Sequence, residues 1–257
     1  MIAAVSQKLS RRSAAVAVAL ETRFDTILKG WMLVAGLIAT ARCTMGPAAH
    51  ERIEFVSVVP YFLVVLAPVA SALLALSWFP VGHRLAQPTT RLAIVGRWRS
   101  VDRAEATAHP LYGPQGMIVS LLVGMLLNVP VRAAEYFAAM PPIPVDAPHW
   151  LVTLKTMMTL DVVIFSSLYT VAFIAALRRV PLFPRLLAAI WLADLAMQLG
   201  IAEMVSRQPG LPGNVATALT GLLAGNVKKV LIGMAIWTPY LLLSERVNVT
   251  YRSRVSA

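Results

Sequence analysis

Charged residues are scarce in this chain, and cysteine is almost absent. Only 14% of the 257 residues are Asp, Glu, Lys or Arg, whereas an average soluble domain has about 25%. A water-soluble fold of this length needs more polar surface to cover its core, so the composition excludes an ordinary soluble protein. The single cysteine, Cys43, excludes an intrachain disulfide and any cysteine-based metal cluster.

Motifs that carry chemistry are also missing. The sequence contains no nucleophile elbow, phosphate-binding loop or dinucleotide fingerprint. Four histidines fall in or near the expected loops without the spacing of metal ligands: His50, His83, His109 and His149. We therefore expect no metal site and no cofactor. The sequence favours a non-enzymatic protein, although it does not exclude a membrane enzyme.

Apolar residues dominate instead, at 58% of the chain, with a mean hydropathy of +0.70. A helix needs about 20 mostly apolar residues to cross a bilayer. We therefore expect an all-α, polytopic membrane helix bundle of six spans. They cover residues 27–41 (extending to 49), 56–79, 116–131 (extending to 140), 151–177, 186–204 and 226–243.

The sixth span has an ambiguous start. Residues 214–244 would make a helix of about 46 Å, which is too long for one upright crossing. We therefore predict a short surface helix at 215–224 before the span. Gly221 and Gly225 form a small-x-x-x-small pair that would let another helix approach closely, although this pattern is common by chance.

Lys and Arg in short loops orient such a bundle, because they remain on the cytoplasmic side. Alternate loops and the two ends hold 16 of these residues, and the other loops hold four: Arg42, Arg52, Arg132 and Arg207. We therefore expect both the N-terminus and the C-terminus in the cytoplasm. Anionic lipid headgroups then account for the net charge of +11, and no nucleic-acid partner is needed.

The spans divide the chain into four parts. Residues 1–24 form an amphipathic cytoplasmic segment, and residues 25–80 form a two-helix hairpin. Residues 81–114 form a basic cytoplasmic loop, in which 90–108 is expected to be a basic surface helix with Trp98 at headgroup depth. Residues 115–257 form a four-helix membrane domain.

Ionisable side chains inside a span need a partner, water or a function. Counting from the cytoplasmic arginines places Asp161 and Lys229 about 25 Å, and Glu203 and Lys228 about 27 Å, above the inner surface. A cluster of these four near the outer mouth follows as a hypothesis. It is either a structural ion-pair network that holds helices together, or a polar site for a small ion or proton.

Asp194 lies deeper, about 13 Å from the inner surface by the same count. Its expected neighbours are all neutral: Asn128, Ser166, Ser167 and Gln198. A lone buried carboxyl group is expected to stay protonated and to donate a hydrogen bond. Asp194 is then either a structural contact between helices or part of a proton relay.

The last span ends in an aromatic and basic segment. Trp237 and Tyr240 are placed at the inner interface, where amphipathic rings prefer to sit, and Arg246 ends the span. Pro239 removes one backbone donor and is expected to kink this helix. We interpret Trp237, Tyr240 and Arg246 as an interfacial anchor.

The same segment carries a resemblance to a family. The ending contains Trp-x-x-Tyr at 237–240, Ser-x-Arg-Val at 244–247 and Thr-Tyr at 250–251, and a basic turn with a Phe-Pro pair lies at 178–185. Residues 109–254 thereby resemble an uncharacterised family of small four-helix bacterial inner-membrane proteins. The resemblance implies a multi-pass protein of the bacterial inner membrane with a cytoplasmic C-terminus, and it implies no activity.

Together these observations favour an integral inner-membrane protein that acts as a non-enzymatic accessory or assembly subunit. Its partners are then the lipid bilayer and either further copies of itself or a larger membrane complex. The alternative is a small-solute or proton-coupled transporter, which requires Asp194 or the outer charges to face a water-filled cavity.

Overall fold

The computed structural model describes residues 2–45, 55–80, 86–89, 96–144 and 146–257. In these ranges the fold is all-α, as expected, apart from two three-residue strands. In chain order the elements are α1 (Ile2–Thr22), α2 (Phe24–Met45), α3 (Phe55–Trp78), β1 (Trp98–Ser100), α4 (Arg103–Ala108), α5 (Met117–Ala139), α6 (His149–Leu177), α7 (Phe183–Ser206), α8 (Gly213–Leu243), α9 (Glu245–Arg252) and β2 (Arg254–Ser256).

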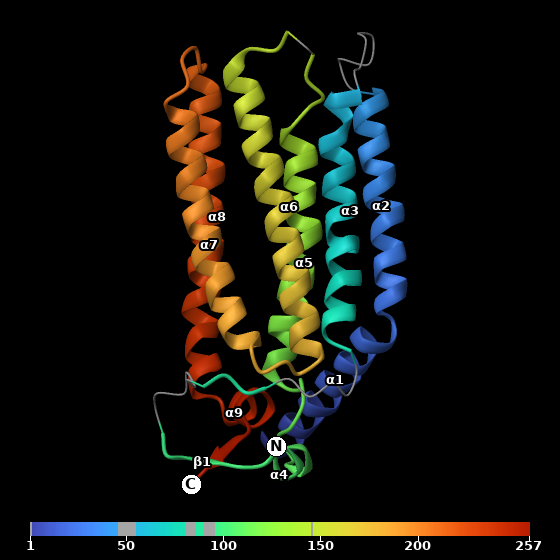
Figure 1. Ribbon diagram of the computed structural model, residues 1–257, viewed down its shortest axis with the longest axis vertical. Helices are drawn as coiled ribbons and strands as arrows, with labels where there is room; N and C mark the ends of the chain where they lie inside the picture. Colours follow the sequence, from blue (N-terminus) through green and yellow to red (C-terminus); the bar gives the residue numbers. More distant parts are fainter. Residues whose placement is uncertain (1, 46–54, 81–85, 90–95, 145) are drawn as a thin grey trace.

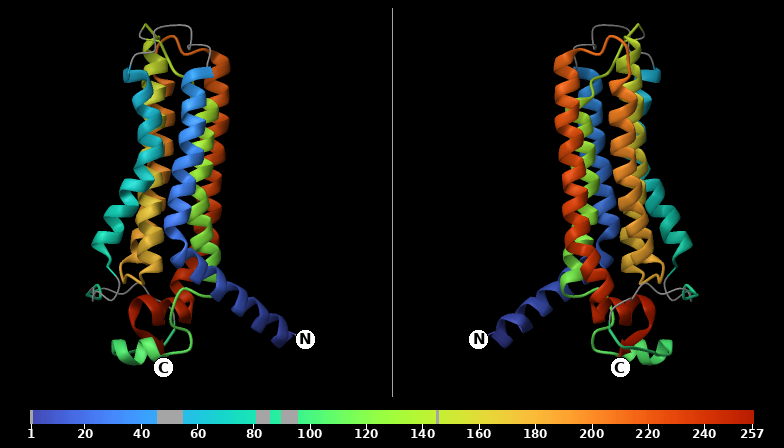
Figure 2. Two further views of the ribbon diagram at one scale, coloured as in Figure 1. Left: turned by 90° about the vertical axis from the view of Figure 1, so that its right-hand side faces the viewer. Right: turned by 90° about the vertical axis from the view of Figure 1, so that its left-hand side faces the viewer.

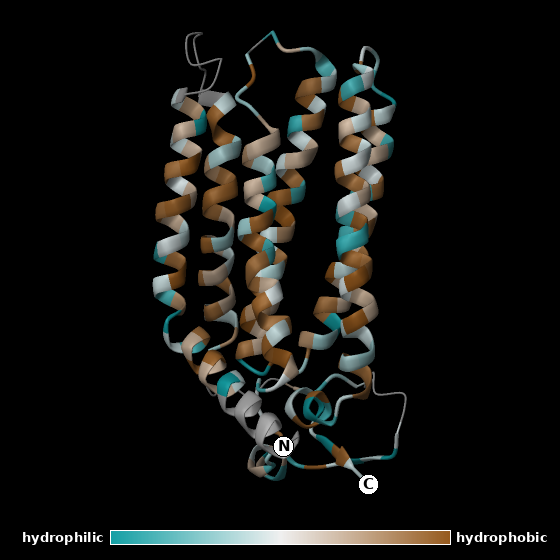
Figure 3. Cartoon of the chain, turned by 180° about the vertical axis from the view of Figure 1, so that it is seen from behind, coloured by the Kyte–Doolittle hydropathy of each residue, from teal (hydrophilic) through white to brown (hydrophobic). Residues whose placement is uncertain are grey.

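Six of these helices are long and apolar enough to span a membrane, which confirms the expected number. They are α2, α3, α5, α6, α7 and α8, and they stand side by side in one upright bundle (Figure 1). Apolar residues cover most of their length, while hydrophilic residues gather at the base and at a few levels within the spans (Figure 3). The outward apolar surface suits contact with lipid.

Helix α6 is the centre of the bundle and the most buried span. It packs against α3, α5 and α7, while α8 packs mainly against α7. Ala75 of α3 and Ala172 and Ala176 of α6 are fully buried in one cluster. Small side chains allow membrane helices to approach closely, which explains the tight packing of α3 on α6.

The N-terminal hairpin of α2 and α3 is joined to the rest of the bundle by specific contacts. The Tyr61 hydroxyl donates a 2.7 Å hydrogen bond to the carbonyl of Met140, and its ring stacks on Phe137. Lys155 of α6 donates to the carbonyl of Ser57 at 3.1 Å. The lower half of α3 lies at an angle to its upper half (Figure 2), and Pro68 inside this helix removes the backbone bond that would keep it straight.

The C-terminal segment ties the base of the bundle together. Arg246 donates to the carbonyls of Leu111 and Gly113 at 3.1 and 3.4 Å, and the Tyr251 hydroxyl donates to the carbonyl of Ala176 at 2.9 Å. Burial and repulsion from neighbouring arginines lower the pKa of Arg252 to about 10. The N- and C-termini lie at this same end of the bundle (Figure 1).

The expectation of a basic surface helix at 90–108 is wrong within the described residues. Strand β1 pairs antiparallel with β2, with Arg99 opposite Val255, and only α4 is helical. Residues 90–95 lie outside the described residues. A strand of three residues is too short to show a periodicity in the sequence. Its partner strand also lies far along the chain, so the local residues do not predict the pairing.

The division of the sixth span is also wrong. Helix α8 runs unbroken from Gly213 to Leu243 and contains the segment expected to be a separate surface helix. No described atom comes within 4 Å of a Cβ built at Gly221 or Gly225. The two glycines therefore allow no close helix approach within this chain, and α7 supports the extra length of α8 by packing beside it.

Candidate functional site

One arginine on α5 binds two aspartates on the neighbouring helices. Arg132 Nη1 lies 2.7 Å from Asp161 Oδ2 on α6, and Arg132 Nη2 lies 2.7 Å from Asp194 Oδ2 on α7. The three residues are 8%, 2% and 0% exposed, respectively. Charged groups of this kind are expensive within a membrane unless they are paired, and this pairing joins three spans at one point.

Further donors surround the two carboxylates. Gln198 Nε2 donates to Asp161 Oδ1 at 2.8 Å and to Asp194 Oδ1 at 3.3 Å. The Tyr169 hydroxyl donates to Asp194 Oδ2 at 3.1 Å. The Arg132 guanidinium also lies over the ring of Phe165, 5.1 Å from its centroid. These contacts leave both carboxylates hydrogen-bonded through both of their oxygens.

The network continues to α8 through an amide chain. Asn226 Nδ2 donates to Gln198 Oε1 at 3.3 Å, and Lys229 donates to Asn226 Oδ1 at 3.3 Å. Lys229 also forms an ion pair with Glu135 of α5. This second pair is much more exposed, at 58% for the Lys229 side chain and 35% for that of Glu135. The network therefore links α5, α6, α7 and α8.

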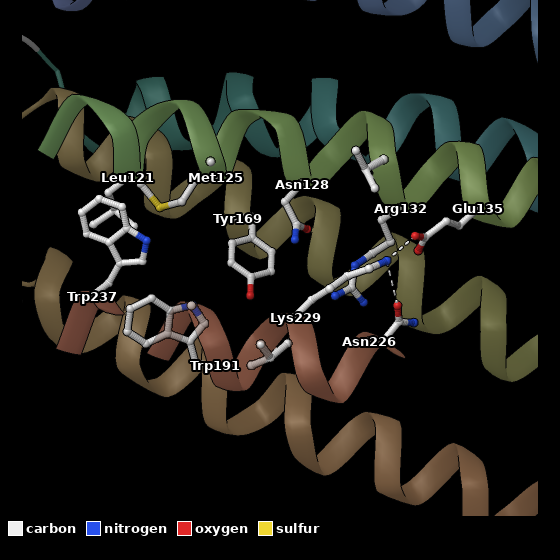
Figure 4. Close-up of a pocket in the computed structure, with 14 residues that line it drawn as sticks. Leu121, Met125, Asn128, Arg132, Glu135, Tyr169, Trp191, Asn226, Lys229 and Trp237 are labelled. Carbon is white, nitrogen blue, oxygen red and sulfur yellow. Dashed lines mark hydrogen bonds and ion pairs between the residues drawn. The ribbon is translucent and has the colours of Figure 1, made fainter. Parts of the chain in front are cut away.

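A cavity of about 190 Å³ lies against this network, with walls from α5, α6, α7 and α8. Arg132, Glu135 and Lys229 line one end, and the aromatic rings of Trp191 and Trp237 line the other (Figure 4). The Asp161 and Asp194 carboxylates lie behind Arg132 and are not part of the wall. A solute in the cavity would therefore meet the guanidinium first and the carboxylates only through it.

Asn128 adds an unsatisfied group to the same cavity. Its Oδ1 atom is buried and has no hydrogen-bond partner among the described residues. Buried polar groups nearly always have a partner, supplied by protein, water or ligand. Asn128 Oδ1 therefore marks a place in the wall where a donor from water or a bound molecule fits.

The helices that build this site match a known protein family. Residues 115–252, which comprise α5 to α9, match the model of the family described as "Protein of unknown function (DUF2569)". The chain belongs to this family. Every residue of the charge network lies within the matched part, whereas α1, α2 and α3 lie outside it. Searches of the curated proteins and of the solved structures gave no match.

Asp194 has different surroundings from those expected. Among its four expected neutral neighbours, Gln198 does contact it, but Arg132 makes the shorter contact. The expectation of a lone carboxyl group is therefore wrong, because the distribution of Lys and Arg in the sequence places Arg132 in an outer loop, whereas it lies inside α5. Arg132 lies 15 residues after the start of α5, about 22 Å along its axis. The count that placed Asp161 would have placed Arg132 at the same level.

The four outer charges do not form a single cluster within the described residues. Asp161 and Lys229 do belong to one network, through Gln198 and Asn226. Glu203 forms an exposed ion pair with Arg207, the residue directly after the end of α7, instead. Lys228 lines a different cleft, of about 390 Å³, between α7 and α8. Equal height in a bundle does not place two side chains on facing sides of their helices.

Two residues of the expected interfacial anchor contact each other, and the third binds elsewhere. The rings of Trp237 and Tyr240 meet edge to face with centroids 5.8 Å apart, and Trp237 also lines the cavity. Arg246 binds backbone carbonyls of the segment before α5. No group of three or more His, Cys, Asp or Glu residues that suits a metal ion occurs in the described ranges.

Proposed function

We propose that this protein is a proton-coupled transporter of a small carboxylate-bearing solute, with the α5–α8 cavity as its binding site. The observation that carries the proposal is the position of Arg132. Its guanidinium is buried between two aspartates on one side and forms part of a cavity wall on the other. We therefore prefer the transporter to the accessory subunit that the sequence favoured. A transporter requires a cavity beside the buried charges, and such a cavity lies there.

The proton in this proposal follows from the charge balance. Arg132 carries one positive charge, whereas Asp161 and Asp194 together carry two negative charges when both are ionised. An uncompensated charge is costly in a membrane interior, and a proton shared by the two aspartates removes it.

The solute class follows from the chemistry of the wall. Arg132 has five N–H donors, and its two ion pairs leave others available. A planar guanidinium matches a carboxylate in a two-bond geometry. When a second proton neutralises the other aspartate, a solute carboxylate replaces it on Arg132, so that one proton accompanies each solute and the total charge stays at zero. Trp191 and Trp237 then enclose the apolar part of the solute.

Reconstituted protein tests this proposal. Liposomes containing a trapped pH dye are given small monocarboxylates, and then a matched set of small amines, with protein-free liposomes as the blank. We expect protein-dependent proton entry with at least one carboxylate. Asp194→Asn should abolish it, whereas Glu203→Gln on the same helix should retain it. Proton entry that is absent from the wild type, or is unchanged in Asp194→Asn, contradicts the proposal, and entry driven only by amines contradicts the solute class.

We place this activity in a bacterial inner membrane, with both termini in the cytoplasm. The support is the basic composition of the base, where both termini lie (Figure 1). Fusion of a reporter that fluoresces only in the cytoplasm to the C-terminus should give signal. A reporter that is active only in the periplasm should remain inactive at the same position.

An accessory or assembly subunit is the second candidate, and the surface of α8 favours it. This helix is the least buried span, and Leu231, Ile232 and Ile236 are exposed along it. Purification in mild detergent from native expression, followed by sizing and identification of bound proteins, tests this role. A stoichiometric partner supports it, whereas a homo-oligomer or a monomer without a partner contradicts it.

A further inference from the structure

A second cavity lies on the opposite side of α5 from the charge network. It is a cleft of about 510 Å³ between α2 and α5, with Pro68 of α3 and Phe173 of α6 at its back. Helices α2 and α5 stand beside each other here (Figure 2). We name it the α2–α5 cleft. It separates a helix outside the family match from one inside it.

The walls of the α2–α5 cleft are almost entirely apolar. Their polar side chains have partners elsewhere: Trp31 Nε1 donates to the carbonyl of Val65 at 2.9 Å, and Thr170 Oγ1 donates to the carbonyl of Ser166 at 2.7 Å. A water molecule needs two to four polar partners to remain in a cavity. The described side chains of this cleft offer it none, so an ordered occupant must be a hydrocarbon.

The cleft is also elongated along the membrane normal. Its wall on α2 extends from Phe24 to Ile38, about 21 Å along the helix axis. The hydrocarbon core of a bilayer is about 30 Å thick. A groove that covers most of this depth fits an extended acyl chain better than a compact apolar ligand. An empty groove would lose the dispersion contacts of its walls, so a chain from the surrounding bilayer is stabilised there.

The lower end of the cleft lies next to a basic residue. Phe24 is the first residue of α2, and it directly follows Arg23 in the elbow between α1 and α2. Arg23 is exposed, whereas Arg12 lies 11 residues earlier, about 16 Å along α1, which leaves the base of the bundle at an angle (Figure 2). Cations at the end of an apolar groove complement a negatively charged headgroup.

We infer that the α2–α5 cleft binds one acyl chain of an anionic phospholipid, whose headgroup lies against Arg23. The lipid fills the space between the N-terminal hairpin and the family domain. This site is separate from the proposed transport site, because the two cavities open on opposite faces of α5 and have only Met125 in common. The inference does not depend on transport activity.

Two glycines on α2 provide a matched test of the cleft. Gly30 lines it and Gly36 does not, and no described atom lies within 4 Å of a Cβ built at either position. Gly30→Phe should therefore fill the cleft without distorting α2, while Gly36→Phe adds the same side chain elsewhere. Val34→Trp provides a second way to fill the cleft, since Val34 also lines it.

The measurement is native mass spectrometry of the full chain in mild detergent, after addition of phosphatidylglycerol or phosphatidylcholine. We expect the wild type and Gly36→Phe to retain one phosphatidylglycerol, and Gly30→Phe and Val34→Trp to lose it. Helical circular dichroism and sizing establish that each variant folds. Retention of the lipid in both folded filling variants overturns the site.

The headgroup contact is tested separately. Replacement of Arg23 by Gln should reduce the preference for phosphatidylglycerol over phosphatidylcholine several-fold, while acyl binding persists. An unchanged preference overturns the placement of the headgroup. Equal binding of both lipids by the wild type overturns the requirement for an anionic one.

Discussion

Arg132 and Asp194 are 62 positions apart in the chain, and they meet through a 2.7 Å ion pair inside the bundle. Asp161 occupies the other terminal nitrogen of the same guanidinium at 2.7 Å. The pair therefore belongs to a set of three charges in which the two negative groups depend on one positive group. Removing any one of them has consequences that differ from those of an ordinary surface ion pair.

Replacement of Arg132 by Gln should destabilise the protein strongly. It leaves two buried carboxyl groups without a cation, and breaking a buried ion pair typically costs about 3–5 kcal/mol. Replacing Arg132 by Met together with Asp161→Asn and Asp194→Asn should recover most of this loss, because no buried charge remains. Thermal unfolding in detergent measures both, and Arg207→Gln, at an exposed pair, serves as the control. A single variant as stable as this control contradicts the expectation.

Replacement of Glu135 by Gln should have little effect on stability. Its ion pair with Lys229 is partly exposed, and exposed pairs contribute about 0–1 kcal/mol. The proposed transport should respond more, because this pair forms part of the cavity wall and its loss changes the charge that a solute meets. Proton entry into liposomes should change several-fold, while the melting curve stays close to that of the wild type. Equal and large changes in both would indicate a structural role.

Replacement of Tyr61 should weaken the attachment of the N-terminal hairpin. Tyr61→Phe removes the hydrogen bond to the Met140 carbonyl, at a cost of about 0.5–1.5 kcal/mol. Tyr61→Ala also removes the buried ring, and a substitution of this size costs about 3–5 kcal/mol. Unfolding measurements should rank the wild type, Phe and Ala in this order. Limited proteolysis should cleave the Ala variant between the hairpin and the family domain first.

Tyr251 should make stability depend on alkaline pH. Burial raises the pKa of its hydroxyl above the ordinary value of about 10, because the ionised form has no water around it. An acid with a raised pKa in the folded state contributes stability below its unfolded pKa, and this contribution is lost as the pH rises above that value.

The comparison of the wild type with Tyr251→Phe isolates this effect. At pH 7–9 the wild type should be more stable, since it keeps the bond to the Ala176 carbonyl. The difference should shrink as the pH rises past about 10, because Tyr251 then ionises in the unfolded wild type but stays protonated in the folded protein. The other buried tyrosines titrate equally in both proteins and cancel in the comparison. Chemical unfolding at a series of pH values measures the difference. A constant difference up to pH 11 would show that Tyr251 does not titrate on unfolding.

Composition and hydropathy alone were enough to predict a six-span helical bundle. A run of about 20 apolar residues has few alternatives in a membrane, because every backbone polar group must be satisfied within its own helix. The family resemblance at 109–254 was likewise visible in the sequence, and the matched residues 115–252 agree with it. The orientation of the bundle stays a prediction from the distribution of Lys and Arg.

Tertiary structure alone decided which charges meet. Height along a helix follows from counting residues, but the count placed Asp161 and Asp194 at different levels, whereas the structure brings both to one guanidinium. The side of the helix that faces a neighbour depends on rotation and packing, which separated Glu203 and Lys228 from that network and brought Arg132 to Asp161 and Asp194. Long side chains also reach across levels, and a count along one helix does not include this reach. The sequence therefore determined what each span is made of, and packing determined which of its faces carry the site.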